Sequence, residues 1–361
     1  MFSFYLLRPI SAPNICCLCD THSLLTHPYT PMHRERFDDH QFSPLRLFDV
    51  EGLVAVVTGG GSGIGLMMAK ALENNGAIVY IVGRRHDVLQ QAAQENSRFN
   101  NIIPLQGDIT IRESLSAIVQ IVKARHGYID LLVNNAGIAR NLYIHPLPSP
   151  EDSSEARSPP SPPASPTCEP SQPSIKAFQS ALWDSGTPDD FAETFSTNVT
   201  APYYTTVAFL DLLHQGNLRQ QENAFSKFMT IPPFHSSQVI TVSSSGSFRV
   251  DPKIVSMSYT LSKTASTHLG KCLANLLAPW NIRSNVLAPG VWPSEMTNSR
   301  LSPNSKLDPR SMAMTVPLKR AGTEGEMAGT ILFLASKAGA YVNGAVWLID
   351  GGRVNSVASS Y

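Results

Sequence analysis

Tyr259 and Lys263 stand four residues apart in the stretch YTLSK, so on a helix both side chains would lie on one face. Such a pair can move a proton to or from the oxygen of a carbonyl or an alcohol. A free tyrosine has a pKa of about 10, and ionising it at pH 7 requires about 4 kcal/mol of preferential stabilisation. A nearby ammonium supplies part of that energy, whereas a neutral tyrosine can donate its proton directly in the reductive direction.

A glycine-rich turn lies far upstream, where the apolar run LVAVVT ends. Gly59, Gly63 and Gly65 permit a tight turn from a strand into a helix and let the backbone approach a pyrophosphate. The free N–H groups and the positive dipole end of the next helix would bind that anion. A glycine fingerprint alone is weak, but this one follows an expected buried strand and precedes the helical stretch LMMAKALENNG. It therefore predicts a dinucleotide site.

Seven short apolar runs surround these residues, each separated from the next by enough chain for a helix. Continuous β-branched runs indicate strands buried on both faces, which is typical of a parallel sheet. We therefore predict an α/β fold with a doubly wound, parallel, seven-stranded sheet in a single domain. The expected strands are residues 53–58, 77–83, 101–108, 128–135, 238–244, 282–290 and 345–352.

Composition separates other segments from this domain, which we place at residues 49–353. Residues 1–48 show no steady period and are expected to be a disordered tail, and residues 354–361 a C-terminal tail. Residues 142–180 form a Pro/Ser-rich insertion, which has no Val, Ile, Leu, Met or aromatic residue between positions 149 and 174. Such a segment cannot bury enough surface to offset its ordering entropy. It is either a neutral insertion or a docking site for a partner.

Overall composition excludes several classes of protein. The 361 residues carry 28 Lys and Arg and 28 Asp and Glu, and zero net charge argues against nucleic-acid or membrane-surface binding. Five unevenly spaced cysteines favour a reducing compartment, and Cys16, Cys17 and Cys19 lack partners for a metal site. With no secretory signal and no apolar run approaching 18 residues, we expect a cytoplasmic protein.

Three motifs in order, TGGGSGIG at 58–65, NNAG at 134–137 and YTLSK at 259–263, resemble the short-chain dehydrogenase/reductase family. The resemblance spans about residues 49–353 apart from the insertion. It implies a Rossmann-type fold, a nicotinamide cofactor and interconversion of a ketone or aldehyde with an alcohol, and it favours a homodimer or homotetramer. The surrounding sequence looks most like reductases of fungal secondary-metabolite pathways and like ketoacyl-carrier-protein reductases.

The resemblance also implies partners for the tyrosine. Three serines, 243 to 245, follow the predicted strand VITV, and the family's catalytic serine is normally the second of a strand-ending pair. That position is Ser244, with Ser245 as the alternative because the spacing to Tyr259 is slightly longer than usual. Asn198 matches the family's helix asparagine, which holds a water in a proton relay near the lysine.

The end of the second predicted strand bears on the choice of cofactor. An acidic residue there would bind the ribose 2′-OH and repel a 2′-phosphate. This chain has Arg84 and Arg85 instead, so we predict NADP(H) rather than NAD(H), unless both are solvated helix-start residues. The other implied cofactor contacts are Gly59, Ser62, Gly63, Ile64 and Gly65 of the glycine turn, Asp108 and Ile109 near the adenine, Asn135 and Gly137 beneath the adenosine ribose, Tyr259 and Lys263, and Val291 and Ser294 of the carboxamide loop.

Two further interpretations stay open at this stage. A non-catalytic dinucleotide-binding scaffold or sensor could use the Pro/Ser-rich insertion for partners, although it would need none of the serine, tyrosine, lysine and asparagine set. A serine hydrolase is disfavoured because no G-x-S-x-G elbow occurs. Residues 292–315 supply Trp, Met and Leu among prolines and polar residues, so they could form an adaptable lid over an apolar substrate or simply pack.

Overall fold

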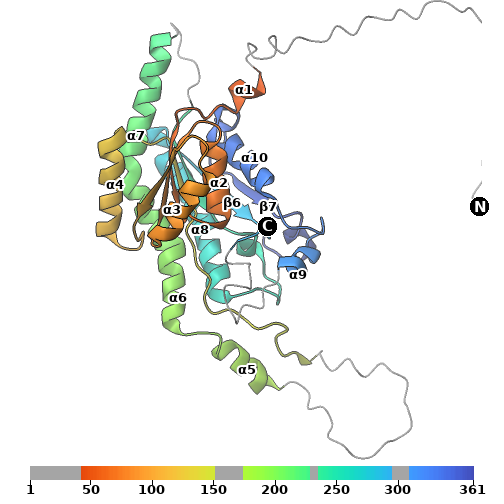
Figure 1. The fold of residues 1–361 in the computed structure, drawn as a ribbon. Helices are drawn as coiled ribbons and strands as arrows, with labels where there is room; N and C mark the ends of the chain where they lie inside the picture. The colour runs from red at the N-terminus through yellow and green to blue at the C-terminus, as the bar shows by residue number, and fades with distance from the viewer. Residues whose placement is uncertain (1–41, 151–173, 228–234, 295–308) are drawn as a thin grey trace, which may run out of the picture. The chain divides into compact units, whose positions relative to one another are not determined.

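Seven parallel strands form one sheet in the computed structural model, which describes residues 42–150, 174–227, 235–294 and 309–361 (Figure 1). The strand order within these residues is β3-β2-β1-β4-β5-β6-β7. Every strand lies inside one of the predicted ranges, so the doubly wound sheet is confirmed. The strands are β1 (Val54–Thr58), β2 (Ile78–Gly83), β3 (Ile102–Gln106), β4 (Leu131–Asn134), β5 (Gln238–Val242), β6 (Arg283–Pro289) and β7 (Val346–Ile349).

Helices cover both faces of the sheet. One face is packed by α2 (Gly63–Glu73), α3 (His86–Asn96) and α10 (Glu324–Ala335). The other face is packed by α4 (Arg112–His126), α7 (Ala201–Lys227) and α8 (Met257–Leu277). The remaining α-helices of the described chain are α1 (Pro44–Leu47), α5 (Ile175–Trp183), α6 (Pro188–Phe195) and α9 (Pro309–Met314).

Burial along β1 shows why the apolar runs are continuous. Successive side chains of a strand point to opposite faces of the sheet. Ala55 and Val57 therefore belong to the core beneath α2, α3 and α10, whereas Val54 and Val56 belong to the core beneath α4, α7 and α8. All four are fully buried. The alternating pattern of a half-exposed strand is absent from β1 because both of its faces are covered.

The order reverses between β1 and β4, which are neighbours in the sheet although β2 and β3 separate them in sequence. The loops that follow these two strands leave toward opposite faces. Such a point opens a crevice at the carboxyl ends of the strands, where doubly wound proteins bind their ligands. The glycine-rich turn after β1 and the NNAG loop after β4 therefore lie at the same edge.

The predicted insertion, residues 142–180, overlaps described residues at both of its ends. Near the first end, the backbone N–H of Tyr143 donates to the carbonyl of Val255 (2.9 Å). At the other end, residues 175–180 belong to helix α5, which the sequence analysis did not foresee and which begins after an N-capping Ser174. Residues 151–173, the proline-rich part, lie outside the described residues, as do residues 1–41 of the predicted tail. No described helix is long and apolar enough to cross a membrane.

A buried carboxylate fixes the turn that leads into β3. Glu73, the last residue of α2, is fully buried and accepts hydrogen bonds from the Ser97 hydroxyl (2.6 Å) and from the backbone N–H groups of Phe99 (2.6 Å), Arg98 (2.9 Å) and Asn101 (3.2 Å). Burial alone would raise the pKa of Glu73, but these hydrogen bonds outweigh it and hold the pKa below its usual value. The ionised carboxylate thus positions the strand that precedes the predicted adenine site.

We expect Glu73→Gln to lower the free energy of unfolding at neutral pH by about 1–3 kcal/mol, because hydrogen bonds to a charged acceptor are the stronger ones. The pKa of Glu73 is lower in the folded chain, so its ionised form stabilises the fold above the unfolded-state pKa of about 4.3, and that contribution is lost as pH falls through the folded value. Urea unfolding at neutral pH and at acid pH measures both effects. Glu95→Gln, on the exposed side of α3, is the control. Equal losses in the two variants would contradict this role.

Candidate active site

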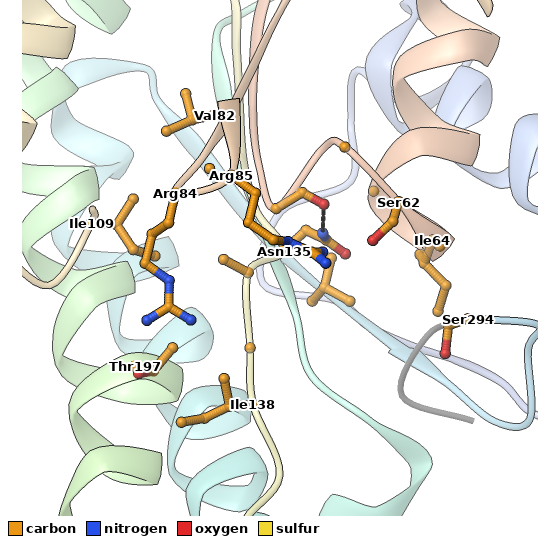
Figure 2. A pocket seen from close by; sticks show the side chains of 18 of the residues that line it. Ser62, Ile64, Val82, Arg84, Arg85, Ile109, Asn135, Ile138, Thr197 and Ser294 are labelled. Atoms are coloured by element: carbon orange, nitrogen blue, oxygen red, sulfur yellow. Dashed lines mark hydrogen bonds between the residues drawn. The ribbon is translucent and has the colours of Figure 1, made fainter. Parts of the chain in front are cut away.

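A pocket of about 350 Å³ opens at the carboxyl ends of the strands, beside the reversal of strand order (Figure 2). Its walls come from the turn after β1, the end of β2, the segment after β3, the loop after β4 and the start of α8. Most of the predicted site residues line it: Gly59, Ser62, Gly63, Ile64, Gly65, Arg84, Asp108, Ile109, Asn135, Gly137, Tyr259, Lys263 and Ser294. Three predicted site residues do not line it: Ser244, Asn198 and Val291.

The glycine turn has the geometry that a pyrophosphate site needs. Gly59 and Gly63 adopt left-handed backbone angles, with φ of +63° and +52°. A Cβ on Gly65 would collide with the carbonyl oxygen of Gly59 and with the side-chain nitrogen of Asn135. Helix α2 begins at Gly63 beside the pocket, so its first N–H groups and its positive dipole end are available to an anion there. The residues present therefore fit a dinucleotide.

Thr58 joins the two loops that part at the sheet reversal. Its hydroxyl donates to the carbonyl of Val133 (3.3 Å) and accepts from the backbone N–H groups of Asn135 (3.0 Å) and Ala136 (3.1 Å). The side-chain amide of Asn135 donates in return to the carbonyls of Thr58 (2.9 Å) and Gly59 (3.1 Å). Asn135 was predicted to lie beneath the ribose, and these contacts show that its amide group holds the glycine turn. The role of Thr58 could not be predicted from the sequence, because a strand-ending threonine carries no signal of its distant partners.

The serines after β5 have separate tasks. The Ser243 hydroxyl donates to the carbonyl of Lys263 (2.8 Å) and shares a hydrogen bond with Thr267 (2.6 Å), so it fixes α8 against the sheet. The Ser244 side chain instead forms a hydrogen bond with Tyr259. Of the two serines that the sequence left open, Ser244 is thus the one beside the tyrosine hydroxyl.

Tyr259 and Lys263 lie one turn apart on α8, as the spacing predicts. The Lys263 ammonium donates to the carbonyl of Val242 (2.8 Å) and lies 5.9 Å from the centre of the Tyr259 ring. Burial raises the pKa of Tyr259, and the hydrogen bond from Ser244 opposes that rise without cancelling it. Burial also lowers the pKa of Lys263 to about 8. The protein groups therefore keep Tyr259 protonated at neutral pH and do not by themselves produce the phenolate that oxidation of an alcohol would need.

Asn198 lies in a π-helical turn, Ser196–Thr200, between α6 and α7. Its side chain accepts from the backbone N–H of Ile138 (2.9 Å) and donates to the carbonyl of the same residue (2.9 Å) and to Ser262 (3.0 Å). π-turns are frequent at functional sites because they re-aim a side chain within a helix. These contacts support a positioning role for Asn198, and the water relay that the resemblance implies stays a prediction.

Gly137 separates this asparagine from the lysine. A Cβ at Gly137 would lie 3.1 Å from the Asn198 side-chain oxygen and 3.2 Å from the Lys263 nitrogen. Both distances are tighter than ordinary contacts, so only glycine leaves the two groups undisturbed. The loop after β4 can therefore pass close to α8 while it lines the pocket.

The far end of the pocket carries the two arginines. Arg84 and Arg85 are exposed at the end of β2, and Figure 2 shows both side chains extending from this strand end into the pocket. At the neighbouring strand end, the Asp108 carboxylate accepts from the backbone N–H (2.9 Å) and the hydroxyl (2.7 Å) of Thr110, and Ile109 is nearly buried. A Cβ on Gly83 would lie 3.5 Å from Leu89, an ordinary contact, so this position has room for a side chain.

The predicted carboxamide loop after β6 is partly described. Ser294 lies against the glycine turn, because a Cβ on Gly63 would be 3.0 Å from its Cβ. Val291 is buried, accepts from the N–H of Gly322 (3.0 Å), and lines a second pocket of about 450 Å³ rather than the first. Of the predicted lid, residues 295–308 lie outside the described residues, and α9 follows them.

Comparison with known proteins identifies the family. Residues 53–154 match the family described as short chain dehydrogenase, and residues 175–353 match the family described as enoyl-(acyl carrier protein) reductase. The chain is 44% identical over 320 residues to the short-chain dehydrogenase/reductase PhomF of Diaporthe leptostromiformis, covering 87% of this chain and 96% of the relative. It is 43% identical over 324 residues to VdtF of Byssochlamys spectabilis, covering 87% and 97%. The chain belongs to the short-chain dehydrogenase/reductase family.

A solved structure with the same architecture binds a cofactor of the predicted kind. The RhlG/NADP active-site complex of Pseudomonas aeruginosa superposes with a TM-score of 0.64 at 25% identity, covering 85% of this chain and 98% of that one. This likeness agrees with the Rossmann-type sheet described above. The resemblance that the motifs predicted is therefore confirmed at the level of family and fold.

We expect Thr58→Val to lower the free energy of unfolding by about 2–4 kcal/mol, because the nearly isosteric methyl leaves the N–H groups of Asn135 and Ala136 without their acceptor. Urea unfolding measures the loss. Thr330→Val removes an exposed helix hydroxyl, which donates to the carbonyl of Glu326, and serves as the control. A free energy of unfolding within about 0.5 kcal/mol of the control would show that the hydrogen bonds of Thr58 between the two loops contribute little to stability.

Proposed function

We propose that the chain is an NADP(H)-dependent reductase that converts a ketone or aldehyde of an organic substrate into an alcohol. The observation that carries the proposal is the contact of Ser244 with Tyr259, one helical turn from the buried Lys263, at the edge of a pocket whose other end bears two arginines. A protein that only sensed a dinucleotide would need the pocket without this cluster. The fungal relatives favour a secondary-metabolite substrate, and a 3-oxoacyl-[acyl-carrier-protein] reductase among the relatives favours an acyl one.

Proton transfer follows from the arrangement. A carbonyl oxygen placed between the Ser244 and Tyr259 hydroxyls would accept a hydrogen bond from each, and Tyr259 would donate its proton as the alkoxide forms. The bound nicotinamide supplies the hydride. Lys263, whose ammonium is buried close behind the ring, stabilises the phenolate that remains.

The pKa directions favour reduction over oxidation at neutral pH. Because burial raises the pKa of Tyr259, the tyrosine begins the cycle as an acid. In the oxidative direction it would have to begin as a phenolate, and the positive charges of Lys263 and of an oxidised nicotinamide would have to offset its burial. The alcohol-forming direction therefore makes the smaller demand on the site.

Arg84 is the residue that we assign to cofactor choice, with Arg85 assisting. Its guanidinium extends into the pocket from the end of β2, where the adenosine ribose lies if the pyrophosphate occupies the glycine turn. A 2′-phosphate there would form a charge-assisted, bidentate pair with the guanidinium. Location in the cytoplasm and assembly as a homodimer or homotetramer are further predictions of the proposal.

We expect Tyr259→Phe to lower kcat by two or more orders of magnitude and to leave cofactor affinity nearly intact, because only the proton donor is removed. A panel of ketones and aldehydes, followed by the loss of NADPH absorbance, first identifies a substrate and then measures the variant. Tyr341→Phe, at a fully exposed tyrosine, is the control. Full turnover in Tyr259→Phe would remove Tyr259 from the mechanism, and a chain that reduced no carbonyl in the panel while binding NADPH would support the sensor alternative.

Cofactor choice is tested at Gly83 and Arg84. We expect the wild-type chain to prefer NADPH over NADH by about ten- to a hundredfold in kcat/KM. A charge-assisted contact contributes about 1.5–3 kcal/mol, which corresponds to a ratio of that size. Gly83→Asp with Arg84→Ile should shift the preference toward NADH, and the space at Gly83 accommodates the new side chain. Arg125→Ile, at an exposed arginine on α4, removes the same charge elsewhere. A wild-type preference for NADH would show that Arg84 is a solvated residue at the start of a helix.

A further inference from the structure

The last residues of the chain return to the loop that carries Ser244. After β7 the backbone turns through Gly351 and Gly352, both in left-handed conformations. The N–H of Val250 then donates to the carbonyl of Ala358 (3.0 Å), and the N–H of Ser360 donates to the carbonyl of Phe248 (2.8 Å). We call residues 357–361 the C-terminal strap. It forms an antiparallel bridge in which Ser359 lies opposite Arg249.

A ring contact reinforces this bridge. Tyr361 meets Phe248 edge to face, with ring centres 4.9 Å apart and ring planes at 75°. Such aromatic pairs contribute about 0.5–1.5 kcal/mol beyond the area they bury. Tyr361 is 62% exposed, so its ring is not part of the hydrophobic core and can be removed without opening a cavity there. Its contact with Phe248 is therefore separable from general stability.

The segment under the strap is stiff. Arg249 and Asp251 form a buried, two-point ion pair with both N–O distances at 2.6 Å, and Asp251 also accepts from the N–H of Lys253 (2.9 Å). Burial would raise the pKa of Asp251, but the hydrogen bonds from Arg249 and Lys253 outweigh it and hold the pKa below its usual value. These contacts fix residues 249–253 relative to one another.

Phe248 is one short turn from Ser244. It ends the 3₁₀ helix Ser245–Phe248, in which Ser247 donates to the carbonyl of Ser244 through both its N–H (3.0 Å) and its hydroxyl (2.7 Å). The carbonyl of Ser247 accepts from the Thr264 hydroxyl (2.7 Å) of α8. The 3₁₀ turn that follows Ser244 is therefore held by α8 at Ser247 and by the strap at Phe248.

We propose that the C-terminal strap is a positioning element for the reaction, and that the Tyr361 ring, through Phe248, holds Ser244 at the oxygen of Tyr259. The inference rests on the proposed function, because it concerns the serine that would orient the carbonyl. Tyr361 also lines the second pocket together with Val291 and Trp292, so one side chain adjoins both the serine loop and the loop after β6. Misplacement of a reacting group by about 1 Å can cost a hundredfold in rate.

The test compares Tyr361→Ala with Tyr361→Phe and with Tyr341→Ala, which removes a fully exposed tyrosine elsewhere. We expect Tyr361→Ala to lower kcat by about five- to twentyfold with the KM for NADPH changed by less than about twofold, because only the reacting geometry is disturbed. Tyr361→Phe should restore kcat to within about twofold of wild type, because it keeps the ring and loses only the hydroxyl. The alkaline limb of the reductive pH profile should move to higher pH in Tyr361→Ala, since a displaced Ser244 no longer lowers the pKa of Tyr259.

A double-mutant cycle with Phe248→Ala completes the experiment. If Tyr361 acts through Phe248, the double variant should lose no more kcat than Phe248→Ala alone. Unchanged kcat in Tyr361→Ala, a loss that Tyr361→Phe shares, or independent losses in the double variant would each overturn the proposal. Should Tyr361→Ala fail to fold, Tyr361→Leu takes its place under the same criteria. A wild-type chain that reduces no carbonyl would refute the proposed function itself and this inference with it, and that failure is seen before any variant is made.

Discussion

The site depends on a set of hydrogen bonds at the point where the strand order of the sheet reverses. The Thr58 hydroxyl and the Asn135 amide tie the glycine turn after β1 to the loop after β4, and both loops then line the pocket. Backbone groups buried at such a place must find partners or cost stability. A threonine and an asparagine meet that demand and leave the glycines free to face the pocket. The hydrogen bonds that pair these backbone groups thus also shape the dinucleotide site.

Burial sets the protonation of the tyrosine and lysine pair on α8. Tyr259 and Lys263 lie in surroundings that favour the neutral form of each, so the pKa of the tyrosine rises while that of the lysine falls. The sequence predicted the pair and its shared face, but it left open whether Tyr259 starts as a phenolate or as a neutral proton donor. Spacing along a helix reveals which groups meet, whereas the cost of burying them depends on packing by segments far away in the chain.

Elsewhere too, the sequence revealed features that depend on local pattern and did not reveal those that depend on contacts between distant segments. Continuous apolar runs predicted all the strands of the described sheet, because burial on both faces leaves a pattern within each run. The sequence did not reveal helix α5, which begins inside the expected insertion and ends beyond it, the roles of Thr58 and Ser243, or the return of residues 357–361 to the serine loop. Thr58, Ser243 and residues 357–361 all contact partners distant in sequence, and polar residues of ordinary type carry no mark of such a partner.

The π-turn at Ser196–Thr200 joins α6 to α7 and affects the rotation of one helix relative to the other. A residue added to a helix rotates everything after it by about 100°, since an α-helix has 3.6 residues per turn. Helices α6 and α7 follow each other on either side of this turn without a loop, so the turn sets the rotation of one helix relative to the other. Removal of one residue from this turn would rotate α7 by about that angle relative to α6, and α7 packs against the sheet through Phe209, Leu212 and Leu213. The extra residue of the π-turn thus fixes the rotation of α7 relative to α6.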